Sequence, residues 1–234
     1  MIEIKKGNIF TTKCHTIVNT VNTAGVMGAG IAYEFKLRFP EMFEKYKSFC
    51  HSGLINIGSL WIYKLTKNDN EMYEYILNFP TKTDWKYPSK KEYLEKGLQK
   101  FVDTYKEKGI LSIAFPLLGA SKGGIEEEVS LNIMKKYLDK IDINVEIWHF
   151  DPNAKDDLYE EFREKFLNLD EVLIKEQSKL RVDLIRRIKE ALNINDIHSM
   201  SGLLMVKGIG DVSLEKSFRF IKDFEKNNTN LFTI

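Results

Sequence analysis

Hydrophobic and polar residues change their spacing repeatedly along the first 150 residues. The stretch 110–115 (ILSIAF) is a continuous apolar run, which is typical of a strand buried on both faces. Similar short runs and alternations predict six strands in all, at residues 1–5, 16–21, 58–65, 74–79, 110–115 and 145–150. Helical periodicity predicts helices between them, at residues 31–38, 41–50, 89–108 and 125–138. Strands that alternate with helices of this length indicate an α/β fold of three layers with a mixed, mostly parallel central sheet.

One predicted helix carries a start signal. Ser89 stands at its beginning and Glu92 follows three positions later, which is the spacing of a capping box. We therefore expect the helix 89–108 to begin with Ser89 as its N-cap.

The pattern changes after residues 151–153 (DPN). Residues 158–192 are highly charged and helical in pattern, and contain no glycine or proline. Two further helices are predicted, at 196–206 and 213–224, joined by a short glycine-bearing segment. We place a boundary near residue 155, and predict an α/β domain over 1–155 and a small all-helical domain over 156–234.

Composition narrows the class of protein only a little. Hydrophobic residues make up 43% of the 234 residues and the formal net charge is +1, as in an ordinary globular protein that can bury a core. The two cysteines, Cys14 and Cys50, have no spacing typical of a metal site, so we expect no zinc, no disulfide framework and a reducing cytoplasm. The first ten residues lack the apolar core of a signal peptide, and no apolar run approaches the ~20 residues that span a bilayer.

Two glycine-bearing loops each leave a predicted buried strand and enter a predicted helix. They are residues 19–30 (NTVNTAGVMGAG) and 116–124 (PLLGASKGG). Glycine lets the backbone approach a ligand, and the amides at the start of the following helix favour an anion. Two such loops at the carboxyl ends of neighbouring strands would face one crevice and suit a diphosphate. Such loops also occur merely as turns, and neither is a Walker A or a GxGxxG motif.

The segments GNIFTTKCHTIVNTVN, GVMGAGIA and FPLLGASKGGI resemble, in this order, the macrodomain family, which binds ADP-ribose. The resemblance covers residues 1–155. More narrowly, the region from VNTVNTAGVMGAGIA to YKSFC, with NFPTKTDWKYPS, resembles the DarG branch. Members of that branch are antitoxins that remove ADP-ribose from thymidine bases in DNA and so undo the toxin DarT. The segment NFPTK separates this branch from proteins that only bind ADP-ribose.

The resemblance implies a hydrolase of the N-glycosidic bond, without cofactor or metal, whose substrate is ADP-ribosylated single-stranded DNA. A DarT-like ADP-ribosyltransferase is an implied partner. Two other classes stay open: a non-catalytic ADP-ribose reader or contact-acting antitoxin, and a hydrolase of protein-linked ADP-ribose or O-acetyl-ADP-ribose.

The resemblance also implies roles for residues. Lys82 would be catalytic, either as a proton donor or charge stabiliser, or as a nucleophile with a lowered pKa. Asn22 would orient the distal ribose, although asparagine also shapes turns. The implied ADP-ribose-binding set is Asn8, Ile9, Asn19, Thr20, Gly28, Ala29, Gly30, Ile31, Leu118, Gly119, Ala120, Ser121, Lys122, Gly123 and Phe150. Phe150 would stack on adenine, or belong to the core. Ser121 and Lys122 stand where DarG loops more often have Gly-Asn. Lys122 would contribute a positive charge beside the diphosphate or crowd the distal ribose.

Contacts to DNA are expected at two places. Trp85, close to Lys82, would stack on a base or else pack on its own scaffold. The segment LLMVKGIGDVSL resembles the start of one helix-hairpin-helix motif over residues 203–224. That resemblance implies contacts from Lys207, Gly208 and Gly210 to a DNA phosphate, the alternative being a plain connection between helices. The helix 176–192 is either a solvated face or a toxin-docking face.

Overall fold

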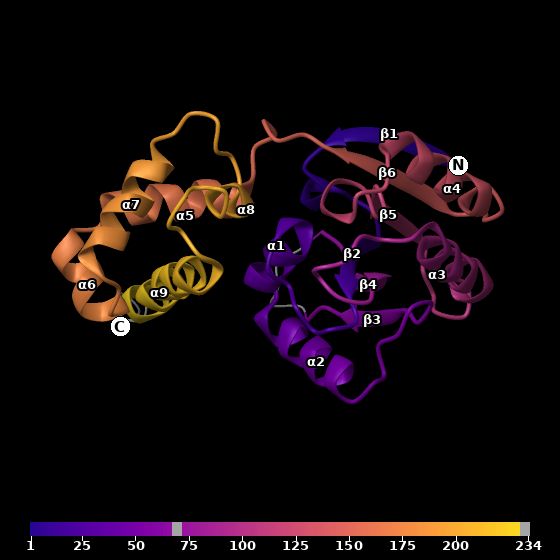
Figure 1. Cartoon of the computed structure of the whole chain (residues 1–234), viewed down its shortest axis with the longest axis horizontal. Helices are drawn as coiled ribbons and strands as arrows, with labels where there is room; N and C mark the ends of the chain where they lie inside the picture. Colours follow the sequence, from indigo (N-terminus) through magenta and orange to yellow (C-terminus); the bar gives the residue numbers. More distant parts are fainter. Residues whose placement is uncertain (67–71, 230–234) are drawn as a thin grey trace. The chain divides into compact units, whose positions relative to one another are not determined.

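The computed structural model describes residues 1–66 and 72–229 of the chain, and the side chains up to residue 224 (Figure 1). The chain divides into two compact units, Met1–Asp151 and Pro152–Ile234. The first unit is built on a central sheet and the described part of the second is helical.

The sheet of the first unit has six strands in the order β1-β6-β5-β2-β4-β3. All neighbours are parallel except β3 and β4, which are antiparallel. The prediction of a mixed, mostly parallel sheet is therefore confirmed. The strands are β1 (Ile2–Gly7), β2 (Thr16–Asn22), β3 (Trp61–Lys64), β4 (Tyr75–Lys82), β5 (Ser112–Pro116) and β6 (Asn144–Phe150).

Helices cover both faces of this sheet, as Figure 1 shows. They are α1 (Gly30–Arg38), α2 (Pro40–His51), α3 (Lys91–Thr104) and α4 (Glu127–Leu138), with short 3₁₀ turns η1 (Ile9–Thr11) and η3 (Ser121–Gly123). Successive residues of a strand point to opposite faces, and β2 follows this rule. Ile17 joins the core formed with α1 and α2, whereas Val18 joins the core formed with α3 and α4. The fold therefore has the three layers that the sequence pattern predicts.

The start of α3 differs from the prediction. The helix begins at Lys91 with Lys90 as its N-cap, and Lys90 makes no side-chain cap bond. The prediction that Ser89 caps this helix is wrong, because the Ser89 amide donates to Gly123 O at 2.9 Å and thereby holds Ser89 outside the helix. A contact between distant segments thus overrides a local capping signal.

The second unit contains α5 (Asp157–Asn168), α6 (Glu171–Ser178), α7 (Val182–Leu192), α8 (Met200–Leu203) and α9 (Asp211–Thr229). The helical stretch predicted over 158–192 is broken twice. Asp170 starts a new helix by accepting hydrogen bonds from the amides of Val172 and Leu173, and Lys179 ends that helix in the left-handed conformation at φ 57°. The helices pack through aromatic side chains, for example Phe162 of α5 against Phe218 of α9.

Of the helices in the described ranges, none is both long and apolar enough to cross a membrane.

Candidate functional site

Three parallel strands end at the same edge of the sheet. β2 lies between β4 and β5, so the residues that end these strands, Asn22, Lys82 and Pro116, lie along one edge. Asn22 is the register partner of Lys82. Each strand leads into a loop: the first glycine loop (residues 23–29), the aromatic loop (83–90) and the second glycine loop (117–126). In doubly wound α/β sheets, ligands bind at the carboxyl ends of the strands.

The first glycine loop is shaped by the side chain of Asn22. Its Nδ2 donates to Val26 O at 2.6 Å, and its Oδ1 accepts from the amides of Ala24 (3.0 Å) and Val26 (3.3 Å). The hydroxyl of Tyr46, on α2, donates to the Asn22 carbonyl oxygen at 2.6 Å. Burial raises the pKa of Tyr46, which keeps the hydroxyl protonated as a donor. Through these bonds Asn22 shapes the turn. That it also orients a ribose stays a prediction.

The second glycine loop is held by a close steric fit. Gly119 has φ +68°, and a methyl group there would lie 2.9 Å from Ile125 Cδ1 and 3.1 Å from Leu94 Cδ1. A methyl group on Gly123 would lie 2.8 Å from Ser89 Oγ. A side chain at either position would displace these neighbours, and at Gly119 the positive φ also favours glycine, whatever else the loop does.

Lys82 connects the two glycine loops. Its Nζ donates a hydrogen bond to the backbone oxygen of Lys122 in the second loop. Its backbone oxygen accepts from the amide of Thr23 in the first loop, at 3.0 Å. A methyl group on Gly30 would lie 3.9 Å from Lys122 Cγ, which places the start of α1 beside the second loop. The structure therefore brings Asn22, Gly30, Lys82 and Lys122 together.

The electrostatics of this junction favour an anion. Lys82 and Lys122 are cationic, and α1 begins here with Ala29 as an N-cap that makes no side-chain cap bond. The first amides of α1 are therefore not satisfied by an N-cap side chain, and the helix dipole adds positive potential at the same place. Burial lowers the pKa of the half-buried Lys82 amine. Backbone amides and ammonium groups in this arrangement suit phosphate oxygens.

The remaining predicted binding residues fall into two groups. Asn8 follows β1 and Phe150 ends β6, so both lie at the same sheet edge as Lys82. Phe150 is 64% exposed, so it is not a core residue, and Asn8 Oδ1 accepts from the Phe10 amide at 3.0 Å. The other predicted residues near the glycine loops are exposed or half-buried, namely Thr20, Gly28, Ala29, Ile31, Ala120 and Ser121.

Three members of the predicted set lie inside the molecule. Asn19 is fully buried, and its Nδ2 donates to Asn78 Oδ1 at 2.9 Å in the middle of the sheet. Leu118 is fully buried as well, and Ile9 is 7% exposed. The structure does not place these side chains at the surface, so they support the strands and loops from within.

Tyr46, which no motif in the sequence singles out, also supports the first loop. It belongs to the apolar pattern of its helix, and only its hydroxyl reaches Asn22. Thr23 is a second such residue: its hydroxyl donates to Thr83 O at 2.9 Å and ties the first glycine loop to the aromatic loop.

The predicted DNA-contacting residues of the helical unit surround a tight turn. Gly208 has φ +89°, and Arg187 Nη1 lies so close that a methyl group on Gly208 would overlap it. The same guanidinium donates to Lys207 O at 3.4 Å. Gly210 O accepts from the Leu214 amide at 3.0 Å, which begins α9. Lys207, Gly208 and Gly210 are exposed.

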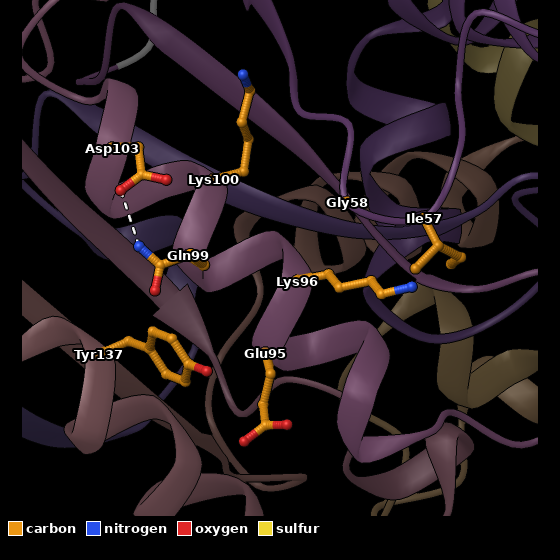
Figure 2. A pocket seen from close by; sticks show the side chains of 8 residues that line it. All are labelled: Ile57, Gly58, Glu95, Lys96, Gln99, Lys100, Asp103 and Tyr137. Carbon is orange, nitrogen blue, oxygen red and sulfur yellow. Dashed lines mark hydrogen bonds between the residues drawn. The ribbon is translucent and has the colours of Figure 1, made fainter.

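A hollow of about 490 Å³ lies on the outer side of α3, away from these loops (Figure 2). Its two carboxylates each have a hydrogen-bond partner. Gln99 Nε2 donates to Asp103 Oδ1 at 2.8 Å, and Lys136 Nζ lies 3.3 Å from Glu95 Oε1. Lys96 and Lys100 share the hollow with these carboxylates, so it offers no concentrated charge to a ligand. The strand-end junction is the better candidate site.

Within residues 1–66 and 72–229, no cluster of three or more His, Cys, Asp or Glu side chains is placed to hold a metal ion. Cys14 and Cys50 are free thiols, and burial raises the pKa of both.

Comparisons with known proteins identify relatives of the first unit. The Macro domain family model matches residues 18–134. A DNA ADP-ribosyl glycohydrolase of Thermus aquaticus is 37% identical over 152 residues, which is 65% of this chain and 41% of that protein. One from Mycobacterium tuberculosis is 36% identical over 149 residues, covering 63% of this chain and 42% of that protein. This chain therefore spans about two fifths of the length of these relatives.

Solved structures agree with this relationship. The macrodomain of Thermus aquaticus DarG is 35% identical with a TM-score of 0.60, and the match covers 64% of this chain and 98% of that one. Thermosipho africanus DarTG in complex with ADP-ribose is 33% identical with a TM-score of 0.58, over 64% of this chain and 41% of that one. Both likenesses concern the α/β unit.

Proposed function

Since this chain belongs to the macrodomain family and is related to DarG glycohydrolases over its first unit, we propose that it removes ADP-ribose from thymidine bases of single-stranded DNA. Such a reaction reverses the product of a DarT-like ADP-ribosyltransferase, which makes that class of toxin its functional partner. The reaction is a hydrolysis of the N-glycosidic bond, and we assign no cofactor to it.

The observation that carries the proposal is the position of Lys82. It ends β4 in register with Asn22, and its amine donates to the backbone of Lys122 in the second glycine loop, whose side chain lies beside Gly30 at the start of α1. An ADP-ribose whose diphosphate binds those amides would direct its distal ribose toward the same junction. A catalytic group must lie within hydrogen-bonding reach of the reacting atoms, and of the two lysines at this junction we assign that role to Lys82, which ends β4 beside Asn22.

Hydrolysis breaks the bond between the anomeric carbon and a thymine ring nitrogen. The oxygen of water bonds to the anomeric carbon, and the thymine nitrogen takes up a proton as it leaves. Lys82 Nζ already acts as a donor in the structure, toward Lys122 O, and we assign it the donor role toward the departing thymine. Fixed orientation of the ribose by the Asn22 loop would supply a further part of the rate gain.

We assign the rest of ADP-ribose to the same sheet edge. The diphosphate would bind the backbone of residues 28–31 and of 119–123, with Lys122 adding charge. Asn8 would accept from the adenine amino group, and the exposed ring of Phe150 would stack on adenine. For Gly30→Glu we expect loss of ADP-ribose binding, because a carboxylate would meet the diphosphate; calorimetric titration with ADP-ribose measures it.

The deciding experiment measures release of ADP-ribose from a single-stranded oligonucleotide that carries ADP-ribosylated thymidine. Wild type is compared with Lys82→Ala, and with Lys108→Ala, an exposed lysine before β5 at the opposite end of the sheet. Release by wild type and Lys108→Ala, but at least 100-fold less by Lys82→Ala, is the expected result. Equal release by all three would remove Lys82 from the reaction.

One alternative function has an observation in its favour. The Lys122 side chain lies beside Gly30, where it would crowd a distal ribose. If no variant releases ADP-ribose while wild type binds it, the protein is an ADP-ribose reader or an antitoxin that acts by contact.

A further inference from the structure

We propose that the aromatic loop (residues 83–90) is a platform that binds single-stranded DNA on one side of the modified nucleotide, with Trp85 stacked on a neighbouring base. The proposal takes its location from the proposed function, because the loop directly follows Lys82 in the chain. Its test, however, uses unmodified DNA.

The side chains of this loop have the character of a single-strand binding surface. Trp85 is 56% exposed and Tyr87 is 62% exposed, so neither ring packs into the scaffold. Lys86 Nζ lies 5.3 Å from the centre of the Trp85 ring. Lys90 and Lys91 follow at the start of α3. Exposed aromatic rings between cationic side chains bind single strands, because every base has a face that stacks and every linkage carries a negative charge.

The loop is ordered by hydrogen bonds at both ends and at its tip. Thr23 Oγ1 donates to Thr83 O at 2.9 Å, and the Ser89 amide donates to Gly123 O at 2.9 Å. At the tip, the carboxylate of Asp84 accepts from the Lys86 amide at 2.9 Å. The loop is thus tied to both glycine loops. A ring carried on a fixed loop loses little conformational entropy when a base stacks on it.

The charge of the aromatic loop favours DNA over an apolar protein as the molecule that binds it. The segment 82–91 (KTDWKYPSKK) contains four lysines and one acidic residue, Asp84. The Asp84 carboxylate already accepts a backbone hydrogen bond within the loop. A polyanion with stacked bases complements this surface better than an apolar protein face does.

The affinity test titrates the full chain with a fluorescein-labelled, unmodified oligothymidylate and follows anisotropy. We expect Trp85→Ala to weaken binding roughly 5- to 150-fold, the range of one stacked base, and Trp85→Phe to restore most of the affinity. Lys86→Glu should weaken binding and lower its dependence on salt. Matched controls are Leu111→Ala and Lys108→Glu, exposed positions before β5, for which we expect wild-type affinity.

A second readout reports on Trp85 itself. The chain contains Trp61, Trp85 and Trp148, and Trp148 is only 9% exposed. Stacking of a base should quench part of the tryptophan emission of wild type, and this quenching should be absent in Trp85→Phe while DNA still binds.

The outcomes separate this proposal from the proposed function. Quenching without any release of ADP-ribose would support the platform and overturn the hydrolase. Release that depends on Lys82, together with equal DNA affinity of wild type and Trp85→Ala, would support the hydrolase and overturn the platform. Loss of DNA binding in Lys207→Glu but not in Trp85→Ala would also overturn it, because the helical unit would then hold the DNA.

Discussion

In the first glycine loop the buried side chain of Asn22 shapes the backbone through hydrogen bonds, whereas in the second Gly119 and Gly123 fit closely against neighbouring side chains. Asn22 makes its bonds to the backbone of Ala24 and Val26. Gly119 and Gly123 instead pack directly against Ile125, Leu94 and Ser89. Both loops connect a buried strand to a helix and reach the same edge of the sheet.

The difference shows that glycines beside the candidate site differ in the structural reason for which a side chain is absent. Gly30, the first residue of α1 directly after the first loop, faces the second loop with space for a methyl group, apart from its φ of +56°. Gly25, inside the first loop, has φ +78°, and a methyl group there would lie 3.3 Å from Cys50 Cβ. In the second loop, Gly119 and Gly123 leave room for the neighbouring side chains of Ile125, Leu94 and Ser89. Substitutions at Gly119 or Gly123 should therefore lower the free energy of unfolding through steric clashes. Substitution of Asn22 should lower it through lost hydrogen bonds.

The largest effect is expected for Gly119→Ala. A left-handed φ costs about 1–2 kcal/mol for a residue with a side chain, and overpacking adds a similar amount, so the free energy of unfolding should fall by about 3 kcal/mol. Gly109→Ala is the matched control, because Gly109 has φ +67° but nothing within 4 Å of an added methyl group. It should lose only about 1–2 kcal/mol.

Urea denaturation followed by tryptophan fluorescence measures this pair, since all three tryptophans lie in the α/β unit. Equal losses for the two variants would mean that the second loop is not sterically determined, and the contrast between the loops would disappear.

A smaller loss, about 2 kcal/mol, is expected for Asn22→Ala. The change leaves partly buried amides and a carbonyl of the first loop without their partner, and groups left in this way cost about 1–3 kcal/mol. Asn56→Ala removes a similar bond, from Asn56 Nδ2 to Gly53 O, but at an exposed turn where water can replace it. The same denaturation experiment should show a loss below about 1 kcal/mol for that control.

Tyr46→Phe should cost about 1 kcal/mol, since it removes a single hydroxyl that donates to the Asn22 carbonyl. Its partner experiment is Tyr137→Phe, at the surface hollow of Figure 2, for which we expect no measurable change. A loss for Tyr46→Phe as large as that for Asn22→Ala would show that the helix, and not Asn22, determines the shape of the first loop.

The last prediction leaves both loops intact and concerns Lys82, where they meet. Burial lowers the pKa of this amine from its ordinary value of 10.5. If its protonated form acts, the rate of ADP-ribose release should fall as pH rises through this lowered pKa, so the decline begins below pH 10.5. A pH–rate profile from pH 6 to 10 measures the slope. A rate that rises over this range would assign the neutral amine as a nucleophile instead.

Much of the fold follows from short-range patterns. The strand at 110–115 is identified by its unbroken apolar run, and the observed β5 (Ser112–Pro116) lies within one or two residues of it. Local patterns mislead where a distant partner intervenes. Ser89 has the sequence of a helix cap, yet its amide donates to Gly123, which is 34 positions away. At the start of α6 the cause is local instead, because Asp170 bonds to the amides of Val172 and Leu173 in a stretch whose composition alone favours continuous helix.

Part of the candidate site can also be predicted from the sequence. The order of strands and loops places the two glycine loops, with Asn22 and Lys122, at one edge of a parallel sheet, whereas Lys82 joins them only through the resemblance of NFPTK to the DarG branch. The hydroxyl of Tyr46 cannot be added in this way, because nothing in the pattern of its helix tells which neighbour it meets. Burial of Asn19 likewise depends on its partner Asn78, which only the strand register reveals.

The bonds from Asn22 have a consequence for how this surface can change during evolution or engineering. Within the loop, the Asn22 side chain bonds to backbone atoms of Ala24 and Val26, and both of these residues are exposed. The path of the loop is therefore nearly independent of which side chains stand at these two positions. A library that varies residues 24 and 26 together should yield folded proteins at high frequency, so this rim of the junction offers a place to alter substrate preference without rebuilding its frame.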